Sequence, residues 1–144
     1  DLDKMSVERF LQTVKSKGLI FDPTLFLCIE NKMDWAVRFV KRANQIGVEI
    51  CAGTDYINDL NRPFPFIFDE LDLYVEKCGF YPMEAIFTVT KVAAEALGVC
   101  DKVGTVEVGK QADLLILSGN PFDDIKELRK IKVVIKRGIE INVD

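Results

Sequence analysis

The stretch that decides the fold is residues 48–55, which read VEICAGTD and directly follow Gly47. Residues 48–52 are apolar apart from Glu49 and include the β-branched Val48 and Ile50, which predicts a short buried strand of a parallel sheet. Gly53 lets the backbone turn without a Cβ penalty, so we expect Asp55 just past the carboxyl end of that strand. Loops that leave this end of parallel strands converge on one rim, where α/β proteins build their sites. Asp55 is therefore the candidate site residue, and the simpler alternative is that it caps the next helix.

The composition limits the classes of function. The chain has 144 residues, of which 49% are hydrophobic and 29% charged, with a net charge of −4. These values are typical of a soluble protein with one core, and they argue against binding to nucleic acid or to an anionic membrane. No apolar run approaches the roughly 18 residues of a membrane span. The chain has four cysteines: Cys28, Cys51, Cys78 and Cys100. They lie at least 22 residues apart, which favours buried reduced thiols in a cytoplasmic protein over a zinc ribbon or a redox dithiol.

The chain contains no histidine. Serine and cysteine nucleophiles usually need an imidazole base, and catalytic zinc sites usually need imidazole ligands. Any chemistry at Asp55 must therefore use carboxylates alone or groups from protein outside this chain.

The first half of the chain alternates between helical and extended patterns. The apolar spacing predicts a helix over residues 5–17, a strand over 19–21 that continues as extended chain through 25–29, and a helix from the N-cap Asp34 to Gly47. Together with the strand at 48–52, this alternation of helices and strands is typical of βαβ units around a parallel sheet.

The second half begins with an aromatic loop over residues 56–68, which either lines a pocket or covers the end of the sheet. We expect a helix over 69–78 and a single helix from Pro82 to Gly98. Beyond residue 104 the pattern becomes β: short segments at 104–110 and 114–117, then a hairpin of 131–136 with 139–143 whose isoleucines Ile139 and Ile141, with Val143, face inward. This smaller β unit has too few strands to stand alone, so it should pair with strands from elsewhere.

Seven short motifs occur in one order along the chain: AGTD at 52–55, EL at 70–71, PMEAI at 82–86, AAEALG at 93–98, DKVGTV at 101–106, GKQADL at 109–114 and GNP at 119–121. Their order and separations resemble the last part of a metal-dependent amidohydrolase. The resemblance is greatest to the subgroup that contains imidazolonepropionase and the Xaa-Pro dipeptidases.

This resemblance implies an α/β fold: a C-terminal fragment of a (β/α)₈ barrel over residues 1–103, with strands 7 and 8 and their helices, and part of a small β-sandwich domain over 104–144. In that family one or two divalent ions, usually zinc, are held by histidines on the first, fifth and sixth strands, often a carboxylated lysine, and an aspartate on the eighth strand. Asp55 matches that aspartate, which implies a metal ligand that also accepts a proton from the metal-activated water.

The expected reaction is hydrolysis of an amide or cyclic amide C–N bond in a small, dipeptide-like substrate. This chain alone should be inactive, because one carboxylate cannot hold zinc. Exposed surfaces of the incomplete barrel should drive self-association.

Two alternatives remain open. A non-catalytic α/β module would bind Mg²⁺ through Asp22 and Asp55 at adjacent strand ends, and it would need a complete flavodoxin-like sheet. A catalytically degenerate relative would serve as a scaffold. The loop before Glu70 favours the scaffold slightly, because many relatives carry a histidine there and residues 66–69 of this chain are FIFD.

Overall fold

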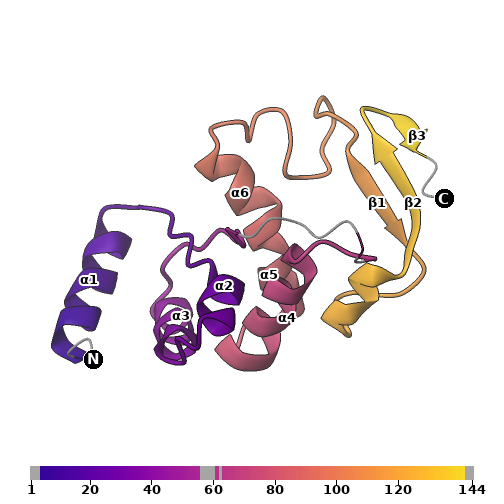
Figure 1. The fold of residues 1–144 in the computed structure, drawn as a ribbon. Helices are drawn as coiled ribbons and strands as arrows, with labels where there is room; N and C mark the ends of the chain where they lie inside the picture. Colours follow the sequence, from indigo (N-terminus) through magenta and orange to yellow (C-terminus); the bar gives the residue numbers. More distant parts are fainter. Residues whose placement is uncertain (1–3, 56–60, 62, 142–144) are drawn as a thin grey trace.

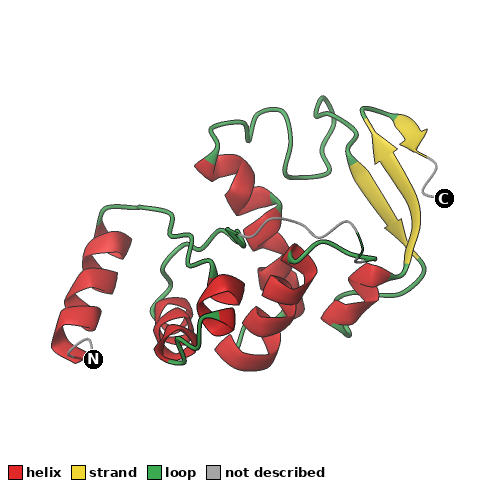
Figure 2. Ribbon diagram, in the orientation of Figure 1, coloured by secondary structure: helices red, strands yellow, loops and turns green. Residues whose placement is uncertain are grey.

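The computed structural model describes residues 4–55, 61 and 63–141. Helices make up the first two thirds of the chain, and a small sheet lies at its C-terminal end (Figures 1 and 2). This combination belongs to the α/β class. The elements follow in the order α1 (Lys4–Ser16), α2 (Leu25–Glu30), α3 (Trp35–Gln45), α4 (Ile67–Cys78), α5 (Pro82–Val89), α6 (Lys91–Ala96), β1 (Leu114–Leu117), the 3₁₀ helix η1 (Ile125–Arg129), β2 (Ile131–Lys136) and β3 (Ile139–Ile141).

The two segments expected as parallel strands do pair, over a shorter length than predicted. Phe21 and Ile50 form an isolated parallel bridge. The N–H of Phe21 donates to the carbonyl of Glu49 at 2.9 Å, and the N–H of Cys51 donates to the carbonyl of Phe21 at 3.1 Å. A parallel pair is weak without neighbouring strands on both sides, which explains why the pairing does not extend over 19–21 and 48–52.

Residues 25–29, predicted to be extended, lie in helix α2, so that prediction is wrong. A short apolar run does not distinguish a buried strand from a buried helix. The deciding contact is distant in sequence: the Glu70 carboxylate on α4 accepts hydrogen bonds from the first two N–H groups of α2, those of Leu25 and Phe26. Asp34 stands at the N-cap of α3 as predicted, although its side chain makes no capping hydrogen bond to any described residue.

The single helix expected from Pro82 to Gly98 is two helices, α5 and α6, which meet at Thr90. Thr90 leaves the helical region, with φ −120° and ψ −89°. Its hydroxyl donates to the carbonyl of Ile86, and the Thr88 hydroxyl donates to that of Ala85. Such side-chain bonds compete with the backbone bonds of a helix, which accounts for the break. Residues 104–110 form turns and not the β segment expected there.

The sheet is antiparallel, with the order β1-β2-β3 and the expected hairpin between β2 and β3. Ile139 is 67% exposed and Ile141 43% exposed, so the prediction that they face inward is wrong. Nothing in the described part of the chain covers that part of the sheet. Val143 lies outside the described residues. The division at residue 104 stays a prediction.

The core lies between the helices and the parallel bridge. It contains Leu11 and Val14 of α1, as the helical spacing predicts, with residues of α3, α4 and the bridge. Tyr74 of α4 and Phe80 also belong to this core, and their rings stack at 4.9 Å between centroids. No helix in the described ranges has the length and apolar character needed to cross a bilayer.

Candidate functional site at the rim of the parallel bridge

Asp55 follows the bridge, as the sequence predicts, and its side chain is exposed. Its backbone has φ +47°, in the left-handed region. Aspartate tolerates this region better than most residues, yet the conformation still costs energy, and such residues gather at functional sites. The backbone thus presents an exposed carboxylate in a conformation that the surroundings must hold.

Contacts to α5 and to Asp22 fix the segment before Asp55. The N–H of Ala52 donates to the carbonyl of Thr88 at the end of α5, at 3.1 Å. The Asp22 carboxylate lies against Gly53, so close that a Cβ at Gly53 would overlap Asp22 Oδ2. Asp22 Oδ1 in turn accepts the N–H of Thr24 at 3.2 Å. Gly53 is therefore needed for close approach of the two segments, in addition to the turn that the sequence suggested.

Glu70 is the most unusual residue near this rim. Its side chain is fully buried, and it accepts the N–H of Leu25 at 2.9 Å and that of Phe26 at 2.5 Å. Burial raises the pKa of Glu70 to about 7, although the two backbone N–H bonds act in the opposite direction. The hydroxyl of Tyr74, which is also buried, lowers the pKa of Glu70, but it makes no hydrogen bond of standard geometry with any described residue.

The sequence showed Glu70 only as part of a motif and gave no role to its carboxylate. A signal was present: Glu70 lies four residues before Tyr74 and next to Leu71, on the apolar face of α4. A carboxylate on a core-facing helix position requires a partner, but the sequence cannot show that the partner is α2.

Of the four cysteines expected to be buried, Cys78 is buried, Cys28 and Cys51 are half-buried, and Cys100 is exposed, so that prediction is wrong for Cys100. Burial raises the pKa of the Cys51 thiol and that of Cys28, and it raises the pKa of Cys78 to about 12. Thiols with raised pKa values hold few thiolates at neutral pH, so these cysteines are poor nucleophiles.

The carboxylates of the rim do not form a metal cage by themselves. Among residues 4–55, 61 and 63–141, no group of three or more potential ligands is close enough together to hold a metal ion. Asp55 has the donor chemistry of one ligand, and the other ligands must come from outside the described residues. For the Mg²⁺ module, Asp22 is turned toward Gly53 and Thr24, and the described part of the chain has no complete parallel sheet.

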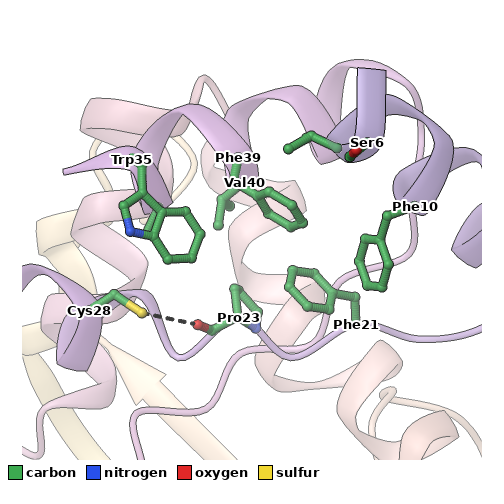
Figure 3. Close-up of a pocket in the computed structure, with 10 residues that line it drawn as sticks. Ser6, Phe10, Phe21, Pro23, Cys28, Trp35, Phe39 and Val40 are labelled. Atoms are coloured by element: carbon green, nitrogen blue, oxygen red, sulfur yellow. Dashed lines mark hydrogen bonds between the residues drawn. The ribbon is translucent and has the colours of Figure 1, made fainter. Parts of the chain in front are cut away.

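An apolar pocket of about 400 Å³ lies between α1 and α3 (Figure 3). The rings of Phe10, Phe21 and Phe39 converge there, with centroid separations between 5.6 and 6.4 Å. Its lining includes no residue of 48–55, and Asp22 does not line it although both of its chain neighbours do. The pocket is thus separate from the rim site. Residues 56–60 and 62 of the loop expected to line a pocket lie outside the described residues.

Asp113, in the GKQADL motif, has a structural role. It accepts the N–H of Arg137 at 2.8 Å and the ammonium group of Lys136 at 2.6 Å. The Lys136 ammonium group, the Arg137 N–H and the Gln111 amide lower the pKa of Asp113 to about 2. The motif therefore anchors the turn between β2 and β3 rather than contributing to the rim.

The model of the amidohydrolase family matches residues 3–141, nearly the whole chain. The chain belongs to the amidohydrolase family. The resemblance seen in the sequence is thereby confirmed.

Proteins similar to this chain include an imidazolonepropionase, an ochratoxinase and a Xaa-Pro dipeptidase. The chain is 35% identical to an imidazolonepropionase of Thermoplasma acidophilum over 95 residues, which cover 64% of this chain and 23% of that enzyme. It is 29% identical to the ochratoxinase of Aspergillus niger over 146 aligned residues, covering 88% of this chain and 29% of that enzyme. A crystal structure of a Xaa-Pro dipeptidase with bound methionine matches 96% of this chain and 37% of its own, with a TM-score of 0.78 and 28% identity. The chain thus spans about a quarter to a third of the length of these curated relatives.

Proposed function

We propose that this chain is the C-terminal part of a metal-dependent hydrolase that cleaves an amide or cyclic amide C–N bond in a small, dipeptide-like molecule. Residues 1–103 would complete a (β/α)₈ barrel, and residues 104–144 would form part of a small β-sandwich domain. The family membership and the imidazolonepropionase and Xaa-Pro dipeptidase relatives support this reaction class. The single observation that carries it is the exposed, left-handed Asp55 directly after the parallel bridge.

In this proposal Asp55 is both a metal ligand and the proton acceptor. A divalent metal, most often zinc in such sites, would lower the pKa of the attacking water. Asp55 then needs only to be ionised and within hydrogen-bond reach of that water. Its exposure leaves the carboxylate open to the space in front of the rim, while Gly53 and Asp22 hold the backbone behind it.

The isolated chain should be inactive, because its described residues offer no group of three metal ligands. The histidine ligands would come from the upstream part of the protein. Large apolar side chains exposed on the sheet and helices, such as Leu97 and Ile139, support the view that other protein covers them. Without that cover we expect copies of the isolated chain to associate, which size-exclusion chromatography would detect.

The test uses the protein from its full reading frame. Purified enzyme should contain a divalent metal by mass spectrometry and hydrolyse members of a panel of Xaa-Pro dipeptides, N-acyl amino acids and cyclic amides. A chelator should abolish the activity, and Zn²⁺ should restore it. Asp55→Asn keeps the shape of the side chain but removes the base, so kcat should fall by roughly 10²–10⁴.

Asp34→Asn is the matched control, because Asp34 is exposed and makes no capping bond to a described residue. It should leave kcat unchanged. A metal-loaded Asp55→Asn enzyme with wild-type activity would rule out the assigned role. A wild-type protein without metal or activity on the whole panel would instead favour the scaffold alternative.

A further inference from the structure

The turn between Phe21 and α2 is held by contacts to residues far along the chain. Thr24 has φ +45°, which is strained for a β-branched residue. Its N–H is bound by Asp22, and the next two N–H groups are bound by Glu70. A strained turn persists only where its surroundings over-determine it, so these carboxylates hold Thr24 in place.

The same turn is connected to the segment that carries Asp55. Phe21 forms the parallel bridge, and its carbonyl accepts the N–H of Cys51. The Asp22 side chain touches Gly53, two residues before Asp55. A displacement of the turn would therefore move both contacts, and with them the backbone of residues 51–55.

From this arrangement we propose that Glu70 is a positioning residue of the rim site: its buried carboxylate clamps the start of α2 and thereby holds Phe21 and Asp22 against the segment that presents Asp55. The catalytic meaning of this inference rests on the proposed function, whereas the mechanical part does not. Both oxygens of the carboxylate are used, one for each N–H. An amide in its place offers a single acceptor, so Glu70→Gln keeps the shape and loses half of the clamp.

The first readout is backbone amide hydrogen exchange of the full-length protein at about pH 6, below the folded-state pKa of Glu70, where the stability that ionisation of this buried group removes is still largely present. In Glu70→Gln the amides of Leu25, Phe26 and Cys51 should exchange roughly tenfold faster, which is the effect of losing a hydrogen bond. Amides of β2, such as that of Val134, should not change. Glu76→Gln is the matched control: Glu76 lies on the same helix but pairs with Lys126 at the surface, so it should alter none of these amides.

The second readout is kinetic, with metal-loaded enzyme. Glu70→Gln should lower kcat at least about tenfold, with KM and metal content near wild type, because a misplaced Asp55 affects the reacting geometry more than binding. A purely structural role would lower the yield of folded enzyme and leave kcat per metal site unchanged. Thr24→Asn, which suits the left-handed region better, should recover part of the kcat and of the Cys51 protection when combined with Glu70→Gln.

The outcomes separate the two proposals. If wild-type enzyme is inactive on every substrate, the proposed function fails, and the exchange data still decide whether Glu70 holds the rim. If only Leu25 and Phe26 exchange faster while Cys51 and kcat stay unchanged, Glu70 is a helix cap alone and the inference is overturned. If Glu70→Gln does not fold, Thr24→Asn tests the coupling between the turn and the rim on which the inference depends: Cys51 should become better protected, and unchanged exchange refutes that coupling and with it the inference.

Discussion

Replacing Gly53 by alanine tests the contact behind Asp55. The new Cβ would overlap Asp22 Oδ2 and lie 3.1 Å from Asp22 Cγ. Overpacking of this kind costs about 1–3 kcal/mol. Alanine also restricts the unfolded chain, which stabilises the folded protein by about 0.4–1 kcal/mol, because the backbone of Gly53 is outside the left-handed region. We therefore expect a net loss of about 1–2 kcal/mol in the free energy of unfolding.

The decisive measurement is a double-mutant cycle with Asp22→Ala. Removal of the carboxylate should itself cost about 1 kcal/mol, because Thr24 loses its hydrogen bond. In that background the obstacle is gone, so Gly53→Ala should become stabilising by about 0.4–1 kcal/mol. Urea unfolding followed by circular dichroism gives all four free energies. The same sign for Gly53→Ala in both backgrounds would refute the reasoning, because the strain would then not come from Asp22.

Three further predictions follow from buried or partly buried polar groups. The folded-state pKa of Glu70 is raised above its unfolded value of 4.5 to about 7, so the folded protein binds the extra proton and stability is lost as pH rises through this window. Urea unfolding at stepped pH should show the free energy of unfolding of wild type falling by about 3 kcal/mol relative to that of Glu70→Gln between pH 4.5 and about 7. A difference between the two proteins that does not change with pH would contradict this prediction. Tyr74→Phe removes a buried hydroxyl without a standard hydrogen bond, so thermal unfolding should show equal or higher stability, whereas a clear loss would show that the hydroxyl is bonded. Arg129→Met breaks an ion pair of 2.9 Å with Asp72 that joins η1 to α4, so the free energy of unfolding should fall by about 1 kcal/mol. This loss should become smaller in about 1 M salt, which screens the ion pair. A loss that salt does not change would show that Arg129 stabilises the protein by packing instead.

The sequence predicts those parts of the fold that depend on local patterns. Helices α1, α3 and α4 follow from apolar spacing and glycine stops, and the hairpin of β2 and β3 follows from Arg137 and Gly138 between two β-branched runs. Asp55 also lies where the glycine-terminated apolar run places it. These features need only neighbours within a few residues, which is why the pattern suffices.

The predictions that were wrong concern elements whose structure depends on contacts distant in sequence. Residues 25–29 become a helix because Glu70 binds the helix start, and Ile139 stays exposed because nothing described covers it. The break at Thr90 reflects hydroxyl bonds that helix propensity does not include. The role of Glu70 could not be predicted from the sequence for the same reason, because a motif identifies a residue but does not show which distant residues it contacts.

The 45-residue separation between Leu25 and Glu70 has a consequence for biosynthesis. A six-residue helix is far too short to persist by itself, so α2 has no means of forming until the ribosome has delivered α4. At about 5–20 residues per second, the nascent segment around Thr24 waits for seconds as an unstructured tether. The order of emergence from the exit tunnel thus delays the native shape of this turn until well after its own residues have been synthesised.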